Sequence, residues 1–334
     1  MDSKIKFIDL FAGIGGMRLG FEQANAKCVL TCEINDKALT TYKRNFLDDD
    51  NHHYFKDILD LKNESLLPDY DILLAGFPCQ PYSIAGLRNG LKDERGGKIF
   101  KAILKILETS KPKAFLLENV KGLLSHNNKK TYLYLKASLK EIGYEVDEDI
   151  LNTMTHANCP QNRERLFIVG FKEKKHLEKF EFPKKEPLLT SIGKCLEKRK
   201  VEDHYYYSDR YKCFDVIKKY VVLKNTFYQY RRVFVRELMT KVCPTLTANM
   251  GSGGHNVPLI LDKHGIRKIT PREAANFQGF PDDYYLPAEL SDSTLYHQIG
   301  NSVSVPLLHR QSLEAFPCRE YASTLYLQQT EITP

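Results

Sequence analysis

The sequence predicts an α/β fold built around a parallel β-sheet. Short, continuous apolar runs occupy residues 72–75, 114–117 and 166–170, as expected of strands that are buried on both faces. Segments with apolar residues at helical spacing, 99–107 and 136–142, lie between them. A glycine-rich turn at residues 11–16 separates a first strand (6–10) from a first helix (17–24). Strand, turn and helix in this order begin nucleotide-binding α/β units.

The composition is that of a globular protein without a membrane segment. The chain has 334 residues, of which 42% are hydrophobic and 27% charged. No apolar run approaches the ~20 residues that span a bilayer, and the first residues lack the pattern of a signal peptide. The eight cysteines form no CxxC pair and no His/Cys cluster at zinc spacing. We therefore expect reduced thiols, no metal site and a cytoplasmic location.

The positive charge is concentrated in one segment. The chain carries a net charge of +7, and residues 171–241 hold 19 Lys/Arg against 10 Asp/Glu together with seven tyrosines between 205 and 230. A basic, tyrosine-rich segment favours a polyanionic partner. A solvated basic face without a partner is the alternative.

Acidic residues follow the early strands. Glu33 ends a second strand (28–32), where a carboxylate can accept both hydroxyls of a ribose. Asn35 is expected to cap the next helix, and Asp57 follows a third apolar patch at residues 54–55. The glycine spacing is not that of dinucleotide-binding proteins, because Arg18 stands where a third glycine is due. Glu33 and Asp57 together favour an adenosyl ligand.

A single cysteine, Cys79, lies on a stiff loop directly after the strand at residues 72–75. Gly76, Pro78 and Pro81 exclude both a helix and a continued strand, and the loop stands where open α/β sheets bind ligands. The alternative is a buried structural cysteine, since free cysteines pack as small hydrophobic residues. The flanking prolines favour a nucleophile. Residues 86–97 are polar and rich in glycine, and we expect them to form a mobile lid.

Charged side chains also accompany the later strands. Glu118 follows residues 114–117, which places it at the same edge as Cys79 and makes it a candidate acid. Arg163 and Arg165 precede the strand at 166–170 and, two residues apart, point the same way from an extended chain. They can bind a phosphate, a carboxylate or a base carbonyl. The alternative is an ion pair with Glu164 or with a strand-end acid.

The remaining chain predicts a nucleic-acid interface and a return to the first domain. Residues 227–232 mix aromatic rings, an amide and guanidinium groups, which read bases and phosphates. Residues 245–249 precede a glycine-rich turn at 250–254 that can approach a duplex closely. Thr270 and Pro271 are expected to begin a helix, and residues 145–151 a strand. Residues 297–306 are expected to form a loop that returns to the first domain.

Five motifs in order resemble those of the C5-cytosine DNA methyltransferases of bacterial restriction–modification systems. They are DLFAGIGG (residues 9–16), GFPCQPYS (76–83), ENV (118–120), QNRER (161–165) and GNSV (300–303). The resemblance implies an α/β fold with a Rossmann-like S-adenosylmethionine-dependent methyltransferase domain and a smaller, irregular target-recognition domain. The domains it implies are a catalytic and cofactor-binding domain (1–182), a target-recognition domain (183–265), a return segment (266–310) and an atypical tail (311–334).

The resemblance also implies a mechanism. The thiolate of Cys79 would add to C6 of a flipped-out cytosine, Glu118 would hold a proton at N3, and Arg165 would bind O2 while Arg163 supports the loop. The lid at residues 83–97 would close over the base. S-adenosylmethionine would contact Phe11, Gly13, Gly15, Glu33, Ile34, Asp57, Pro78 and Asn301. DNA contacts are expected from Ser83, Arg88, Tyr228, Tyr230, Arg231, Arg232, Thr247 and Gly253.

The expected partner is double-stranded DNA, bound by a monomer at a short palindrome and in association with the chromosome. A cognate restriction endonuclease is expected as a functional partner. The alternatives are an RNA cytosine-C5 methyltransferase, a catalytically inactive DNA-binding regulator and, less favoured by Arg18, a nicotinamide dehydrogenase. After Pro306 the family continues with an amphipathic helix, whereas residues 307–334 here show a poor helical stripe.

Overall fold

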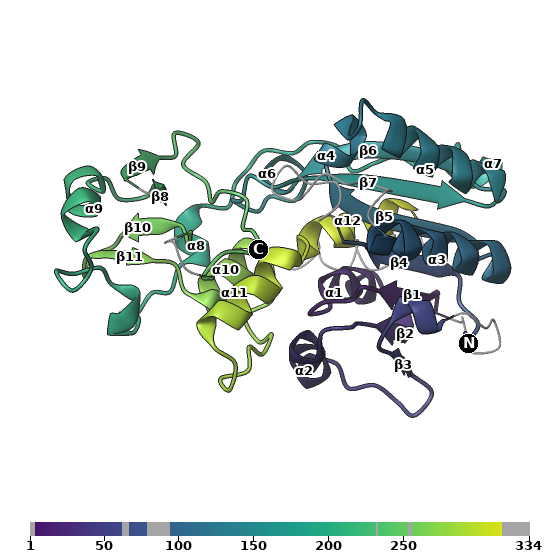
Figure 1. Ribbon diagram of the computed structural model, residues 1–334, viewed down its shortest axis with the longest axis horizontal. Coiled ribbons are helices and arrows are strands. Elements are labelled where there is room, and N and C mark those ends of the chain that lie inside the picture. Colours follow the sequence, from purple (N-terminus) through teal and green to yellow (C-terminus); the bar gives the residue numbers. More distant parts are fainter. Residues whose placement is uncertain (1–3, 62–66, 79–93, 232, 253–255, 316–334) are drawn as a thin grey trace, which may run out of the picture.

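The computed structural model of the chain describes residues 4–61, 67–78, 94–231, 233–252 and 256–315. Its described part comprises a larger unit, around a seven-stranded sheet, and a smaller unit around a four-stranded sheet. The two lie side by side along the longest axis, and helices α10 (Pro271–Phe277) and α11 (Asp292–Asn301) lie between them (Figure 1). The α/β fold class predicted from the apolar runs is confirmed.

The larger sheet has the strand order β3-β2-β1-β4-β5-β7-β6. Strands β1 to β5 run parallel to one another, and β7 is antiparallel to both β5 and β6. The central strands are buried along their length because helices cover both faces, which explains their continuous apolar runs. The strands are β1 (Lys6–Leu10), β2 (Lys27–Cys32), β3 (His53–Phe55), β4 (Ile72–Gly76), β5 (Ala114–Val120), β6 (Glu145–Asn152) and β7 (Glu164–Phe171).

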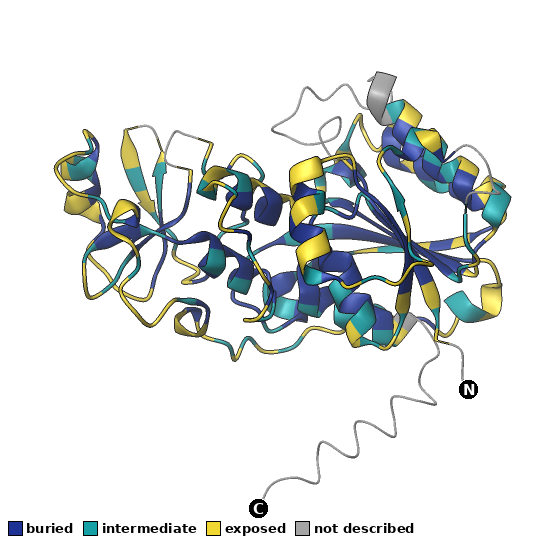
Figure 2. Ribbon diagram, turned by 90° about the horizontal axis from the view of Figure 1, so that it is seen from below, coloured by how far each residue is buried: buried dark blue, intermediate teal, exposed yellow. Residues whose placement is uncertain are grey.

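Helices form a layer on each face of this sheet. One core contains side chains of α1 (Gly16–Gln23) and α12 (Val305–Ala315), and the other contains those of α3 (Glu94–Ser110) and α5 (Lys130–Glu141). Figure 2 shows buried strands in the centre and helices that expose only their outer side. The other helices of this unit are α2 (Asp36–Asn45), η1 (Ile58–Asp60), α4 (Gly122–Ser125), α6 (Thr153–His156) and α7 (Lys174–Leu177).

Local signals place several elements as expected. Asn35 caps α2, and its side chain accepts hydrogen bonds from the N–H groups of Lys37 and Ala38. Thr270 caps α10 in a reciprocal capping box with Glu273. The strand expected at residues 145–151 is β6. The helix expected at 136–142 begins earlier, at Lys130.

Three expectations about loops and the tail are corrected, because helices are found there. Residues 297–301 belong to α11 rather than to a loop, because Ser291 caps this helix and Leu295 and Ile299 are buried along one side. Residues 94–97 of the expected lid lie in α3, and the rest of the lid lies outside the described residues. The expectation that the chain after Pro306 departs from the family's helix is wrong as far as residue 315. Helix α12 buries Leu307 and Leu308 and packs on α1.

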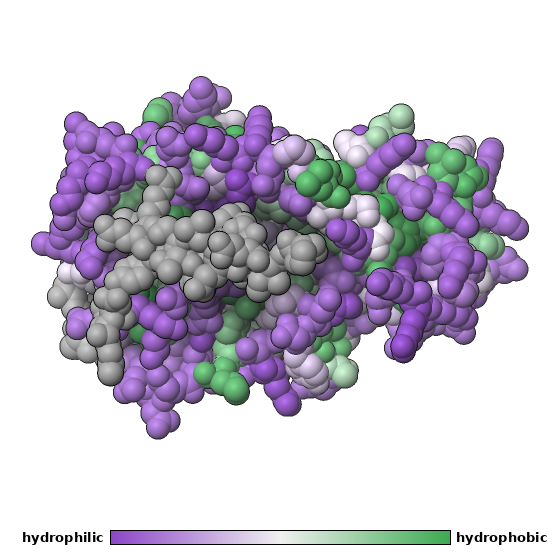
Figure 3. Space-filling model, turned by 180° about the vertical axis from the view of Figure 1, so that it is seen from behind, coloured by the Kyte–Doolittle hydropathy of each residue, from purple (hydrophilic) through white to green (hydrophobic). Residues whose placement is uncertain are grey.

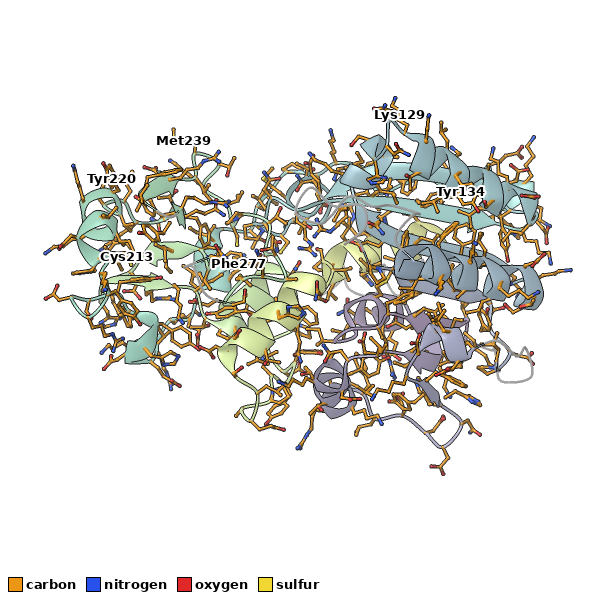
Figure 4. All side chains as sticks on the ribbon, in the orientation of Figure 1. Lys129, Tyr134, Cys213, Tyr220, Met239 and Phe277 are labelled. Atoms are coloured by element: carbon orange, nitrogen blue, oxygen red, sulfur yellow. The ribbon has the colours of Figure 1, made fainter. Side chains whose placement is uncertain are left out.

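The smaller unit is a four-stranded sheet with the order β11-β10-β8-β9. Its strands are antiparallel, and α9 (Phe214–Tyr220) packs on one face through Cys213, Ile217 and Val221. Figure 4 labels Cys213 and Tyr220 on this side of the unit and Phe277 on α10 at the junction. The elements are α8 (Ile192–Cys195), η4 (Asp203–Tyr205), β8 (Tyr228–Arg231), β9 (Phe234–Glu237), β10 (Leu259–Leu261) and β11 (Ile266–Lys268).

The surface seen from behind is largely hydrophilic, with hydrophobic residues in small groups (Figure 3). Among the described residues, no helix combines the length and the apolar character needed to cross a membrane. The predicted domain boundaries stay predictions, although the pairing of β10 with β11 carries the smaller sheet to Lys268.

Candidate active site

The candidate active site lies along one edge of the larger sheet, at the carboxyl ends of four neighbouring strands in the order β2-β1-β4-β5. The glycine turn follows β1, Glu33 follows β2, and Phe77 and Pro78 follow β4. Glu118 lies in β5 and pairs in register with Gly76 of β4. Parallel strands thereby gather residues that are far apart in the sequence, as predicted from the strand ends.

Glu33 closes the glycine turn. Its Oε2 accepts a hydrogen bond from the N–H of Gly13 and its Oε1 one from the N–H of Asn35, each at 2.7 Å. Gly13 and Gly15 have φ angles of 56° and 80°, and a Cβ on Gly15 would lie 2.3 Å from the ring of Phe46. Burial raises the pKa of Glu33, and the backbone donors oppose this shift. A carboxylate oxygen has a second acceptor site, so Glu33 can also accept ribose hydroxyls.

The other cofactor candidates surround this turn. Ile34 is 45% exposed beside Glu33 and offers an apolar surface to a ring. Phe11 is half-buried at the end of β1 and has a positive φ of 59°. Asp57 caps η1, with its Oδ1 accepting from the N–H of Leu59 at 3.0 Å. Pro78 is exposed at the end of β4.

Asn301 lies at the last position of α11, where its side chain is 3.0 Å from Nε2 of His297. The next residue, Ser302, contacts the glycine turn, since a Cβ on Gly16 would lie 2.6 Å from its Oγ. Asn301 is exposed and therefore stands beside the turn with a polar group available to a ligand.

Glu118 is the buried acid of the site. Only 8% of the residue is exposed, and Nε of Arg165 lies 3.0 Å from its Oε1 in an ion pair. The Oε1 atom nevertheless has no aligned hydrogen-bond donor. Burial raises the pKa of Glu118, and the charges of Arg165 and Arg163 only partly oppose this shift. The carboxyl group is thus favourably placed to hold a proton.

The predicted nucleophile, Cys79, lies outside the described residues, as do Ser83, Arg88, Arg232 and Gly253. The start of its loop is visible, because Asn119 donates from Nδ2 to the carbonyl oxygen of Phe77 at 3.2 Å. Gly76 leaves room at this point, since a Cβ there would lie 3.7 Å from Oε2 of Glu118. The strand that leads to Cys79 therefore runs directly beside the buried acid.

Arg163 is bonded to backbone carbonyl groups, whereas Arg165 faces Glu118. It precedes β7, is 2% exposed, and donates to the backbone carbonyl oxygens of Leu246, Gly300 and Ser302. Its guanidinium group therefore holds these backbone segments together. The alternative reading of Arg165, an ion pair with a strand-end acid, is the one found.

The DNA-binding predictions are corrected at two tyrosines. Tyr228 is 0% exposed, and Tyr230 is half-buried, because alternate side chains of β8 face α9. The opposite face carries Gln229 and Arg231 on β8 and Phe234 and Arg236 on β9, paired across the two strands. Arg231 is exposed and donates to Oε1 of Gln229 at 3.1 Å. Thr247 is also exposed.

Two supporting groups were not predicted. Asn119 lies within a motif that the sequence revealed, but its contact with Phe77 depends on strand pairing. Arg18 is buried between α1 and α2, where it donates to Asp48 and Tyr42 and stacks over the ring of Phe46. In the sequence, the arginine at position 18, where dinucleotide-binding proteins have a glycine, was the sign that other contacts support this turn.

Within the described ranges, no group of three or more His, Cys, Asp or Glu side chains could hold a metal ion. The six cysteines of those ranges are free and buried. Burial raises the pKa of the Cys195 thiol to about 12, which makes it a poor nucleophile.

The fold is that of known methyltransferases. A methyltransferase of Entamoeba histolytica, EhMeth, superposes with a TM-score of 0.71 at 18% identity, covering 94% of this chain and 98% of that chain. The Dnmt2 methyltransferase of S. pombe gives 0.67 at 21% identity, covering 98% of this chain and 100% of that chain. The protein therefore has the architecture of a methyltransferase.

The sequence comparisons define the family. The family model described as C-5 cytosine-specific DNA methylase matches residues 5–312. The Type II methyltransferase M.Bsp6I of Bacillus sp. (strain RFL6) is 44% identical over 309 residues, which are 92% of this chain and 96% of the relative. M.HpaII of Haemophilus parainfluenzae is 36% identical over 324 residues, 91% of this chain and 87% of the relative. The chain belongs to the C-5 cytosine-specific DNA methylase family and is a DNA (cytosine-5-)-methyltransferase.

Proposed function

We propose that this enzyme transfers a methyl group from S-adenosylmethionine to C5 of a flipped-out cytosine in a short, specific sequence of duplex DNA. The observation that carries the proposal is the buried carboxyl of Glu118, which pairs in register with the strand leading to Cys79 and is flanked by Arg165. An acid and a cation thus lie at the edge of the sheet from which the chain continues to Cys79.

The residues beside the glycine turn fit S-adenosylmethionine. Glu33 has acceptor sites for the ribose hydroxyls, Ile34 offers an apolar surface to the adenine, and Asp57 can accept from the adenine amino group. Asn301 stands on the far side of the turn, at the place of the amino-acid end, with Phe11, Gly13, Gly15 and Pro78 lining the path between. When bound, S-adenosylmethionine supplies an electrophilic methyl group.

The side chains of the protein would make C5 of cytosine reactive in the following steps. The Cys79 thiolate forms a bond to C6, and Glu118 donates a proton to N3, so that the C5–C6 double bond becomes part of an electron-rich enamine. After C5 has taken the methyl group, a base removes the proton from C5 and the Cys79–C6 bond breaks, while the N3 proton returns to Glu118 and the aromatic ring is restored. Arg165 would hold the O2 oxygen. Flipping the base costs a few kcal/mol.

Contacts to duplex DNA would come from the smaller unit and from the loop after Pro78. Arg231 and Gln229 lie beside the edge strand β9 of the smaller sheet, on the face that carries Phe234 and Arg236. Arginine and glutamine side chains bind base edges in the major groove. Thr247 is exposed at the junction, and Ser83, Arg88, Arg232 and Gly253 belong to the same proposal. The enzyme would act as a monomer on chromosomal DNA in the cytoplasm and protect it from a cognate restriction endonuclease, as in a restriction–modification system.

The direct experiment measures transfer of a labelled methyl group from S-adenosylmethionine to unmethylated plasmid DNA and, separately, to tRNA. Labelling of plasmid DNA alone is expected. Labelling of tRNA alone would show that the substrate is RNA and not DNA. Labelling of neither polymer would refute the proposed methyl transfer. A pool of duplexes containing 5-fluorocytosine should form a covalent adduct with the wild type and none with Cys79→Ser. An adduct that survives this substitution would refute the role of Cys79.

A further inference from the structure

The guanidinium group of Arg163 joins three segments of the chain that lie far apart in the sequence. Its Nη1 donates to the carbonyl oxygen of Leu246 at 2.7 Å, and its Nη2 donates to those of Gly300, at 3.2 Å, and Ser302. The residue is 2% exposed, so these bonds form out of contact with water. A hydrogen bond from a charged donor contributes ~1.5–3 kcal/mol. The three bonds therefore hold these backbone segments firmly together.

The three carbonyl groups flank the residues proposed to contact the two ligands. Leu246 precedes Thr247, and Gly300 and Ser302 stand on either side of Asn301. The two segments also touch directly, because a Cβ on Gly300 would lie 2.2 Å from the carbonyl oxygen of Thr247. The segment at the DNA side and the segment at the cofactor side are therefore packed backbone to backbone.

Further bonds fix the segment at residues 243–247 to the loop that contains Arg163. Cys243 exchanges two backbone hydrogen bonds with this loop. The N–H of Asn162 donates to the carbonyl oxygen of Cys243, and the N–H of Cys243 donates to that of Pro160, each at 2.8 Å. The hydroxyl of Thr245 donates to the carbonyl oxygen of Asn162 at 2.7 Å. Because Arg163 is bonded to the backbone beside both residues, a movement of Thr247 also moves Asn301.

We propose that Arg163 is a positioning residue that couples DNA binding to cofactor binding, so that each ligand raises the affinity for the other. The inference rests on the proposed function, because it takes Thr247 to lie at the DNA and Asn301 at the cofactor. DNA that shifts the segment at 243–247 also shifts residues 300–302, and the cofactor then binds to a site already in place. Linkage requires the same factor in both directions.

The test measures the dissociation constant of S-adenosylhomocysteine with and without unmethylated plasmid DNA. The wild type is expected to bind S-adenosylhomocysteine more tightly in the presence of DNA, by a factor of about 5–150. Arg163→Lys keeps the charge but cannot reach three carbonyl groups, and it should bring the factor close to one. Gly300→Ala provides a second variant, because its methyl group must push the Thr247 backbone away while Arg163 stays intact.

Arg267→Lys is the matched control. Arg267 is likewise a buried arginine, but it pairs with Glu273 and Asp262 within the smaller unit and donates to neither segment. This variant should lose stability and keep the coupling factor, which separates coupling from destabilisation.

A wild type that transfers methyl groups but binds S-adenosylhomocysteine equally well with and without DNA would overturn the inference. So would an undiminished factor in Gly300→Ala or in folded Arg163→Lys. A wild type that transfers no methyl group to any DNA would instead refute the proposed function.

Discussion

Two buried glutamate–arginine pairs, one in each unit, differ in how completely the carboxylate is satisfied. In the smaller unit Glu273 is 0% exposed and accepts two hydrogen bonds from Arg267, at 2.7 Å each, and one each from the N–H groups of Thr270 and Glu197. In the larger unit Glu118 faces Arg165 at 3.0 Å, without an aligned donor on Oε1.

We propose that this difference separates a structural ion pair from one that takes part in catalysis. The oxygens of Glu273 accept several donors held in place by secondary structure, so the pair fixes the start of α10. Glu118 keeps acceptor capacity and, because burial raises its pKa, it can hold a proton. Both pairs are buried, and the completeness of their hydrogen bonding distinguishes them.

The largest expected effect follows from replacing the reactive acid. Glu118→Gln keeps the shape but cannot donate and regain a proton, so the rate of methyl transfer should fall by about 10²–10⁴-fold. Single-turnover transfer to plasmid DNA measures this, and the melting temperature should stay close to that of the wild type. A fall of less than tenfold would show that the carboxyl group takes no part in proton transfer.

The matching change in the other pair should act on stability instead. Glu273→Gln leaves Arg267 buried with its charge no longer fully balanced, which should cost about 3–5 kcal/mol of the free energy of unfolding. Urea unfolding measures the loss, and the transfer rate per folded molecule should be retained at low temperature. If transfer falls while stability does not, the comparison between the two pairs is wrong.

Arg231 extends the comparison to an exposed arginine whose N–H donors can bind a ligand. It is exposed and donates to Oε1 of Gln229 at 3.1 Å, and an arginine side chain can bind O6 and N7 of a guanine. Arg231→Ala should relax discrimination at one base pair of the site by about 1–3 kcal/mol. Arg236→Ala, on the same face, should weaken binding to all sequences alike. Equal loss on all duplexes for both variants would limit Arg231 to phosphate contacts.

Asp9 provides a third buried carboxyl, with no hydrogen-bond partner on either oxygen. Burial raises its pKa from 3.8 to about 8, opposed by Arg18 and reinforced by Glu33 and Glu22. Because the folded state then binds the proton more tightly than the unfolded chain, stability is present at low pH and is lost as the pH rises from about 4 to about 8, by up to ~1.4 kcal/mol per unit.

Asp9→Asn removes this proton and should flatten that part of the stability profile. Urea unfolding between pH 5 and pH 8 measures the slope for both proteins. An unchanged slope in the variant would assign the pH dependence to other groups.

Much of the catalytic edge could be predicted because it depends on local patterns. Continuous apolar runs set the strands, and the ends of parallel strands meet at one edge, which brings Glu33 and Glu118 to the same side. Asn35 and Thr270 are caps that a short window of sequence defines. The helical residues 297–301 were missed because Gly300, Asn301 and Ser302 are typical of a loop. The burial of Leu295, Tyr296 and Ile299 overrides this local tendency.

The sequence by itself determined the order of the strands and helices, the acid at each strand end and the family, since these depend on neighbours within a few residues and on motifs in a fixed order. Only the tertiary structure decided that Arg163 holds the backbone, that Tyr228 faces a core and that Glu118 stays without an aligned donor. The partners of Arg163 lie 83 to 139 residues away. The direction of a side chain is set by such distant contacts, which no local pattern encodes.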